Sequence, residues 1–260
     1  MAGGGMTGKP RVALLIDADN SPASKIGLIL NELSTQGETN IRRAYGNWKK
    51  TELKGWEEQL HEHAIRPMQQ FDYSKGKNAS DMAMVIDALD LLYTDRPDAF
   101  GIVSSDSDFT PLVMHLRAKG AAVYGFGARK TPEPFVNACS RFLFLDDLRA
   151  ASGSDEGDAA DADRGPRLRM PPAELRQDRK LVALLRNAVQ SAADDDGWAY
   201  VNDVRQQIGN QASFDQRNYG YSTLTKLLAA IDLFDFADEG TSNVSVREKR
   251  DKPPGGARRK

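Results

Sequence analysis

Cysteine is nearly absent from this chain. Cys139 is the single cysteine among 260 residues. Neither an intrachain disulfide nor a cysteine-based zinc cluster can therefore be built within one chain. So low a cysteine content suits a reducing compartment, and we expect a cytoplasmic protein.

Long apolar runs are also lacking. No stretch approaches the roughly 18 to 20 consecutive apolar residues that a membrane helix needs. The first nine residues are rich in glycine and have no apolar centre of the kind found in a signal peptide. We therefore expect a soluble protein that is not secreted and has no membrane partner.

An overall excess of positive charge is missing as well, because the formal net charge is -2. Total charge by itself thus gives no indication of nucleic-acid binding. The distribution is uneven, however: acidic residues crowd between residues 155 and 163, and lysine and arginine cluster between residues 247 and 260. The basic end is able to meet phosphates, although a solvated tail has the same composition.

Length and composition predict two folded domains. The chain is 260 residues long, with 40% hydrophobic and 28% charged residues, as in ordinary globular proteins. A stretch rich in Ala, Gly, Ser, Asp and Pro without apolar periodicity marks a linker. We expect a flexible amino terminus (1–10), a larger domain (11–149), an acidic linker (150–172), a smaller domain (173–247) and a basic disordered tail (248–260).

The larger domain has the pattern of an α/β fold. Short apolar runs predict strands, and apolar residues three or four apart predict helices. The strands are expected at 11–16, 41–45, 65–69, 100–104, 121–126 and 142–145, and the helices at 24–33, 49–63, 81–93 and 111–119. Strands that alternate with helices indicate a mostly parallel sheet flanked by helices.

The smaller domain has the pattern of a winged helix. Amphipathic helices are expected at 175–189, 201–208 and 221–231. Two strands, at 233–237 and 243–247, flank Glu239-Gly240, which is a hairpin signal. Three helices followed by a two-stranded ribbon is the order found in winged helices.

Acidic residues follow two of the predicted buried strands. Asp17, Asp19 and Asn20 come after the first strand, and Asp106 and Asp108 come after the strand that begins at Phe100. The carboxyl ends of parallel strands meet at one edge of a sheet, so these side chains should converge in space. A further candidate, Asp81, opens a helix.

Carboxylates gathered in this way repel one another unless hard divalent cations neutralise them. Mg²⁺ or Mn²⁺ is the implied metal, and phosphodiester hydrolysis is the reaction that such a site suggests. The alternative is that each acid only caps a helix, since Asp and Asn are favoured at that position. Two clusters at two strand ends favour a site.

Three motifs make the larger domain recognisable: Leu-Leu-Ile-Asp-Ala-Asp-Asn at 14–20, Lys-Gly-Lys-Asn-Ala-Ser-Asp at 75–81, and Val-Ser-Ser-Asp-Ser-Asp-Phe-Thr-Pro-Leu at 103–112. Between residues 11 and 148 the chain resembles the NYN family of PIN-like ribonuclease domains, which have a Rossmann-like fold. The resemblance implies that RNA is cleaved with Mg²⁺ or Mn²⁺, and it makes a homodimer possible. It implies a catalytic and metal-binding set, with Asn20 in support: Asp17, Asp81, Asp106 and Asp108.

Other polar residues near these motifs are weaker candidates. Asp87 lies six residues after Asp81, which does not place both on one helix face. A role in capping or packing therefore suits Asp87 as well as a place in the site does. Ser105, like Ser104 and Thr110, is able to bond phosphate or form a turn. Lys75 and Lys77 precede Asp81 and are expected to steer the RNA backbone, although a solvated loop would look the same.

Residues 172–246 resemble LOTUS domains, also called OST-HTH, which are small winged helices associated with RNA. The segment that carries this resemblance begins Phe-Asp-Gln-Arg-Asn-Tyr-Gly-Tyr at 214–221. Arg217 and Lys226 are candidates for phosphate contacts, and Tyr219 and Tyr221 for stacking on bases. Phe214 and Tyr221 suit the core equally, and for the aromatic residues the core is favoured over contact.

The leading hypothesis is a ribonuclease, expected to be an endonuclease, whose α/β domain cuts RNA that the winged helix holds. A second hypothesis, from another class, is a non-catalytic adaptor that binds RNA or protein and keeps the acidic fold for structure. A DNA-directed nuclease is a third. Matched RNA and DNA substrates separate the first from the third, and metal binding without turnover would favour the second.

Overall fold

The computed structural model describes residues 8–71, 78–146, 169–238, 241 and 243–249. The chain divides into two compact units, Met1–Glu156 and Gly157–Lys260. Most of the expected flexible amino terminus, acidic linker and basic tail lies outside the described residues, as do Lys75, Lys77 and the Glu239-Gly240 turn.

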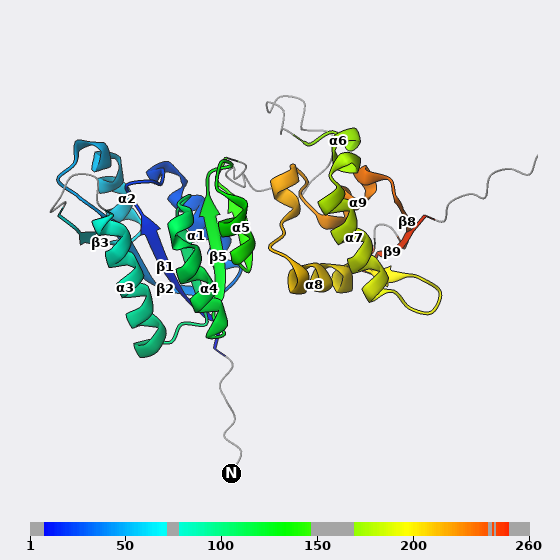
Figure 1. The fold of residues 1–260 in the computed structure, drawn as a ribbon, viewed down its shortest axis with the longest axis horizontal. Coiled ribbons are helices and arrows are strands. Elements are labelled where there is room, and N and C mark those ends of the chain that lie inside the picture. The colour runs from blue at the N-terminus through cyan, green and yellow to red at the C-terminus, as the bar shows by residue number, and fades with distance from the viewer. Residues whose placement is uncertain (1–7, 72–77, 147–168, 239–240, 242, 250–260) are drawn as a thin grey trace, which may run out of the picture. The chain divides into compact units, whose positions relative to one another are not determined.

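The amino-terminal unit is built on one six-stranded sheet (Figure 1). Its strands run in the order β3-β2-β1-β4-β5-β6, and every neighbouring pair is parallel. The expected α/β fold with a parallel sheet is therefore confirmed. The strand bounds are β1 (Arg11–Asp17), β2 (Glu38–Gly46), β3 (Arg66–Gln69), β4 (Ala99–Val103), β5 (Ala122–Gly127) and β6 (Arg141–Phe144).

Helices connect these strands. They are α1 (Ile26–Ser34), α2 (Glu57–Glu62), α3 (Ala79–Thr94), α4 (Thr110–Ala118) and α5 (Glu133–Ala138). Short 3-10 turns at 23–25, 51–56 and 107–109 lead into α1, α2 and α4, so the helix expected over 49–63 is α-helical only in its second half. Helix α5 was not predicted, because six residues opened by Pro132 and Pro134 carry too little periodicity.

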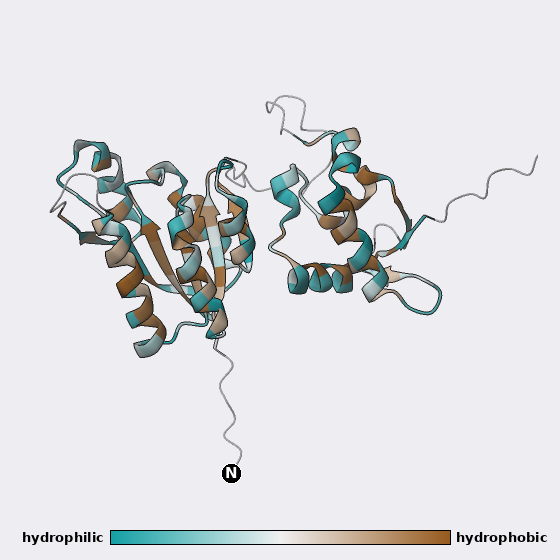
Figure 2. Ribbon diagram, in the orientation of Figure 1, coloured by the Kyte–Doolittle hydropathy of each residue, from teal (hydrophilic) through white to brown (hydrophobic). Residues whose placement is uncertain are grey.

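Strand β1 shows why the sequence run is apolar throughout. Ala13 and Leu15 pack in one core with residues of α3 and α4, whereas Leu14 and Ile16 pack in a second core with residues of α1. The strand is covered on both faces, so its side chains need no polar alternation. Figure 2 shows β1 in brown, the colour of hydrophobic residues. Asp17 continues the alternation on the face of Ala13 and Leu15.

The carboxyl-terminal unit has its own core, in which helices pack on a small antiparallel sheet of order β7-β9-β8. The expected winged-helix order is confirmed, with one additional short strand, β7. The elements are α6 (Pro172–Gln177), α7 (Arg179–Ala192), β7 (Ala199–Tyr200), α8 (Val201–Gln211), α9 (Leu224–Ile231), β8 (Phe234–Ala237) and β9 (Ser245–Glu248).

All three predicted helices in this unit have wrong bounds, and the one expected over 201–208 extends to Gln211. The helix expected over 175–189 is divided at Asp178, whose carboxylate accepts a hydrogen bond of 3.0 Å from the Leu181 amide and so caps α7. The helix expected from Tyr221 begins at Leu224, because Thr223 caps it and the preceding Gly220 has a φ of 82°. Tyr221 lies in the core instead, with 7% of its surface exposed.

Gly125 lets β5 pack closely against the segment that follows it. A Cβ atom there would lie 2.4 Å from Cδ2 of Phe142 and 2.7 Å from Sγ of Cys139. Gly125→Ala is expected to destabilise the amino-terminal unit by about 1 to 3 kcal/mol, the usual cost of overpacking a core. Urea unfolding followed by fluorescence of Trp48 and Trp56, with Trp198 replaced by Phe, measures this change.

The matched control is Gly55→Ala, because a Cβ atom at Gly55 would meet nothing within 4 Å. It is expected to change stability by less than about 0.5 kcal/mol. Equal effects of the two substitutions would contradict the packing argument.

Candidate active site

The order of the strands reverses between β1 and β4, which are neighbours in the sheet although they are far apart in the sequence. Ile16 pairs with Val103, so the two strands reach the same edge together. In open parallel sheets, ligands bind outside the carboxyl ends of the strands at such a reversal. Asp17 ends β1, and Ser104 to Asp108 follow β4, at this edge.

Asp17 is held rigidly, with only 1% of its surface exposed. Its Oδ2 accepts hydrogen bonds from Ser104 Oγ at 2.8 Å and from Asn20 Nδ2 at 3.0 Å, and its Oδ1 accepts one from the Asn20 amide at 3.3 Å. Burial raises the pKa of Asp17 overall, although these hydrogen bonds act in the opposite direction. The expected supporting role of Asn20 agrees with this geometry.

Ser104 joins the first acidic motif to the third. Its hydroxyl donates to Asp17 and accepts from the Asp106 amide at 3.1 Å. Asp106 Oδ1 in turn accepts from the Asp108 amide at 2.9 Å and caps the 3-10 turn 107–109. Asp106 therefore has the capping role that the alternative interpretation gave it, and it still lies at the acidic edge. Asp108 is exposed.

Ser80 joins the first motif to the second. Its hydroxyl donates to Asp19 Oδ2 at 3.1 Å, while Lys50 Nζ lies 3.2 Å from Asp19 Oδ1. Asp81, the next residue, lies in the first turn of α3. Asp19 was not among the residues predicted to be catalytic, and Lys50 carried no signal in the sequence, because its place depends on how the loop after β2 folds.

The carboxylates of the first and third motifs act on Asp81, which belongs to the second. Burial is the main cause that raises its pKa to about 6, and the next causes are the negative charges of Asp17, Asp106, Asp19 and Asp108. Ser104 joins the first motif to the third, and Ser80 joins the first to the second, so the segments that carry these acids lie at one edge of the sheet. That Asp17, Asp81, Asp106 and Asp108 form a catalytic and metal-binding set stays a prediction.

This donor set fits a hydrated Mg²⁺ or Mn²⁺ ion. Carboxylate oxygens are the ligands that hard cations prefer. Among the residues that the structure describes, no group of three or more His, Cys, Asp or Glu side chains lies close enough together to enclose an ion. Mg²⁺ is usually held by one or two carboxylates and keeps several waters, so an open arrangement of acids suits it.

Three other candidates of the amino-terminal unit have structural partners. Ser105 Oγ accepts a hydrogen bond of 2.8 Å from the Ala128 amide and ties the loop after β4 to the end of β5. Thr110 Oγ1 donates to the Ser107 carbonyl at 2.6 Å. Asp87 receives hydrogen bonds from Arg43 and Tyr45 of β2, which fasten the middle of α3 to the sheet rather than to the acidic edge.

In the carboxyl-terminal unit, Arg217 pairs with a buried acid. Its Nε and Nη2 lie 3.0 and 2.8 Å from the two oxygens of Asp215, a residue with 1% of its surface exposed. Tyr219 stacks on Phe214 with ring centroids 5.9 Å apart, and burial, followed by the charge of Asp178, raises its pKa to about 12. Lys226 is exposed. RNA contacts by these three residues stay a prediction.

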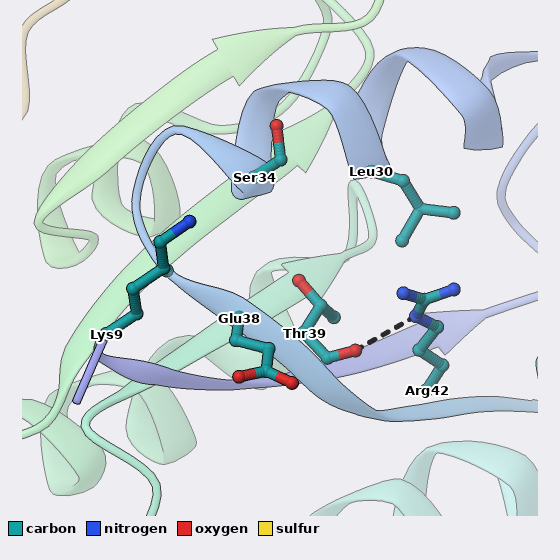
Figure 3. A pocket seen from close by; sticks show the side chains of 7 residues that line it. Lys9, Leu30, Ser34, Glu38, Thr39 and Arg42 are labelled. Carbon is teal, nitrogen blue, oxygen red and sulfur yellow. Dashed lines mark hydrogen bonds between the residues drawn. The ribbon is translucent and has the colours of Figure 1, made fainter.

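A separate pocket of about 290 Å³ (Figure 3) is lined by none of the aspartates described above. It is lined by Lys9, which precedes β1, by Glu38, which begins β2, and by Leu30 and Ser34 of α1. Arg42 also lines it, and its Nε donates to the Thr39 carbonyl at 3.0 Å. Lys9 and Glu38 mark the amino ends of the strands, so this pocket is at the opposite edge of the sheet.

Sequence profiles of two domain families match the chain. The NYN domain profile matches residues 11–146, and the OST-HTH/LOTUS domain profile matches residues 176–246. No helix of the described part of the chain is long and apolar enough to cross a membrane.

Individual relatives are more distant. An uncharacterized protein of Methanocaldococcus jannaschii is 29% identical over 125 residues, which are 46% of this chain and 49% of that protein. This chain thus spans about half the length of that relative. A protein of unknown function from Vibrio parahaemolyticus has 20% identity and a TM-score of 0.45, over 55% of this chain and 97% of its own. An uncharacterized protein of Nitrosomonas europaea has 24% identity and a TM-score of 0.27, over 39% and 96%.

Burial of Asp81, together with repulsion by the neighbouring acids, should lower the free energy of unfolding of the amino-terminal unit at neutral pH. The folded-state pKa of Asp81 is about 6, against 3.8 for the ordinary carboxyl, so its ionisation opposes folding as pH rises through this range. Without divalent cation, Asp81→Asn is expected to stabilise the amino-terminal unit at pH 7.5 by about 1 kcal/mol after allowance for solvent screening. The gain should vanish near pH 4. Urea unfolding in EDTA at both pH values measures it.

Asp90→Asn is the matched control, since Asp90 is an exposed carboxylate on the same helix. It should give no pH-dependent gain. Added Mn²⁺ should stabilise the wild type more than Asp81→Asn, because the acids are then neutralised. A stabilising effect of Asp81→Asn that is the same at both pH values would contradict the repulsion argument.

Arg217 and Lys226 should respond differently to removal of their charge. Arg217→Ala leaves the buried Asp215 carboxylate without its guanidinium, so it is expected to destabilise the carboxyl-terminal unit by about 2 to 3 kcal/mol. Lys226→Ala should leave stability within about 0.5 kcal/mol of the wild type. Hydrogen exchange of the α7 and α9 amides in the full chain measures the stability of this unit in both variants. Equal protection in the two variants would contradict a structural role for Arg217.

Proposed function

The chain belongs to the NYN domain family, and we propose that it is a metal-dependent ribonuclease that hydrolyses phosphodiester bonds of RNA, most simply as an endonuclease. NYN domains are part of the PIN-like nuclease superfamily, which supports a nuclease kind of activity. The LOTUS domain supports RNA, rather than DNA, as the ligand of the second unit.

One observation carries the proposal: hydrogen bonds link the three acidic motifs into a single site. Ser104 bonds both Asp17 and the backbone of Asp106, and Ser80, next to Asp81, bonds Asp19. Acids that only capped helices would have no reason to be tied to one another across β1, α3 and the loop after β4. The linkage also fixes the carboxylate oxygens of Asp17 and Asp19 and one oxygen of Asp106, and fixed orientation is what catalysis requires.

Asp17, Asp81, Asp106 and Asp108, one or two of them directly and the others through bound water, are the residues that would hold Mg²⁺ or Mn²⁺, with Asp19 beside them. When bound there, a divalent ion supplies Lewis-acid stabilisation of the scissile phosphate and activates the attacking water.

The roles of the chain's own residues follow from their contacts. Asn20 and Ser104 hold Asp17 in one orientation, so that its buried carboxylate need not reorganise. Lys50 balances the charge of Asp19 at the β2 side of the site. Asp87 keeps α3, and with it Asp81, in place through Arg43 and Tyr45.

The direct test is cleavage of labelled RNA in Mn²⁺ by the wild type and by Asp106→Asn. The amide oxygen of Asn is still able to accept the Asp108 amide hydrogen bond, so the cap survives while the charge is lost. The variant is expected to lose at least about 100-fold in rate. EDTA should abolish cleavage by the wild type.

Asp98→Asn is the matched control, because Asp98 Oδ2 accepts the Arg11 amide at the opposite edge of the sheet. It should cleave as fast as the wild type. Failure of the wild type on single-stranded and structured RNAs, with RNA still bound, would overturn the proposal in favour of a non-catalytic adaptor. Faster cleavage of matched DNA would assign the site to DNA.

A further inference from the structure

An exposed aromatic ring lies beside the acidic edge. Phe71 comes two residues after the end of β3, and 45% of its surface is exposed. It belongs to neither of the two cores of its unit. Lys49, in the loop after β2, places its Nζ over this ring, 5.0 Å from the centroid. The ring is thus held in place and still largely open to solvent.

The loops that carry Phe71 and Lys49 are fastened to each other. Gln69 Oε1 accepts the Trp48 amide at 3.1 Å, and Gln69 Nε2 donates to Asn47 Oδ1 at 3.1 Å. β2 and β3 are parallel neighbours, so both loops leave the sheet at its carboxyl edge. This platform, Phe71 with Lys49 and Lys50, is therefore part of the same edge as the acids.

Lys50 connects the platform to the acidic site. Its Nζ lies 3.2 Å from Asp19 Oδ1, and Asp19 is bonded by Ser80, the neighbour of Asp81. Lys49 contacts the open ring of Phe71, and Lys50, the next residue, contacts the carboxylate of Asp19. A strand that reached the carboxylates from this side would pass over an aromatic face and two ammonium groups.

An open aromatic ring flanked by lysines is the arrangement that binds unpaired nucleic acid. Every base has a face that stacks on an aromatic ring, and lysines attract the phosphates on either side. A paired helix hides those faces inside its own stack, and side chains cannot enter the narrow major groove of an RNA duplex. Phe71 would therefore select unpaired nucleotides without selecting a particular base.

We propose that Phe71, Lys49 and Lys50 form a stacking subsite that holds an unpaired nucleotide of the RNA next to the scissile phosphate. The position beside the scissile phosphate rests on the proposed function, whereas binding of the strand does not. Phe71 stacks on the base, Lys49 supports the ring and contacts a phosphate, and Lys50 bridges Asp19 and the following phosphate. The substrate class is single-stranded RNA, or a loop or bulge within structured RNA.

The first test measures binding of a short fluorescein-labelled single-stranded RNA to the full chain in EDTA, where cleavage is excluded. Phe71→Ala is expected to weaken binding between about 5-fold and about 150-fold, the range for loss of one stacked base. Phe71→Trp should bind at least as tightly as the wild type. Lys49→Ala should reduce the salt slope of log K by about 0.7, the value for one phosphate of a single strand.

Tyr93→Ala is the matched control. Tyr93 is an aromatic residue with 54% of its surface exposed, it lies at the far end of α3 from Asp81, and its hydroxyl contacts His115. It should bind RNA as the wild type does. Equal loss in Phe71→Ala and Tyr93→Ala, or no loss in Phe71→Ala, would overturn the proposal.

A second test locates the nucleotide. One abasic site is moved along the strand, and each strand is measured with the wild type and with Phe71→Ala. At one position the abasic strand should bind the wild type more weakly and should lose nothing further in Phe71→Ala, because the same stacked pair is already missing. Additive losses at every position would show that Phe71 stacks on no base.

The two proposals fail in different ways. If the wild type cleaves RNA in Mn²⁺, and Phe71→Ala matches it in both rate and affinity, the ribonuclease stands and the subsite is overturned. If the wild type cleaves nothing, but Phe71→Ala loses affinity for single-stranded RNA, the subsite stands without the enzyme. If both hold, Phe71→Ala should raise KM for single-stranded RNA more than it lowers kcat.

Discussion

Mutual repulsion among carboxylates at the carboxyl ends of β1 and β4 is the constraint around which the amino-terminal unit is arranged. Asp17 is buried, and the pKa of Asp81 is raised chiefly by burial and then by four neighbouring acids. Carboxylates at such an edge repel one another, so other interactions have to hold them in place. Two apolar cores, one on each face of the sheet, fix the strands and helices, and Ser104, Ser80 and Asn20 hold the acids through hydrogen bonds. Holding like charges together thus lowers the free energy of unfolding of this unit.

The sequence was informative where one residue type implies one environment. A run such as that of β1 has to be covered on both faces, so the parallel sheet and the convergence of Asp17 with Asp106 follow from pattern alone. It was uninformative where a role depends on which loops meet. Lys50 and Phe71 stand out in no motif, because their partners Asp19 and Lys49 come from other segments. Short elements such as β7 and α5 were missed since two to six residues carry no period.

Residue type alone also does not distinguish an acid that caps a helix from an acid that belongs to a site. Nor does it distinguish an arginine that pairs within the protein from one that binds a ligand. Asp106 caps a 3-10 turn and lies among the acids, so the two interpretations of its position describe one arrangement. Arg217, a candidate for phosphate contact, pairs with Asp215, whose buried carboxylate needs a cation nearby, and contact with phosphate stays a prediction. A charged residue in a turn pairs first with a buried residue of opposite charge nearby. Only the folded structure reveals whether such a residue is there.

An acidic edge presents a difficulty for a ribonuclease, since its substrate is a polyanion. Without cations the acids repel every phosphate, so attraction has to come from the flanks of the sheet and from divalent ions at its centre. Lys49 and Lys50 lie on the β2 and β3 side, and Arg129 and Lys130, both exposed, follow β5 on the other side. A strand that satisfies both flanks must run across the carboxyl ends of the strands and therefore over the reversal between β1 and β4. For a chain with the proposed activity, cations at the two sides and acids in the middle would orient an RNA substrate as well as attract it.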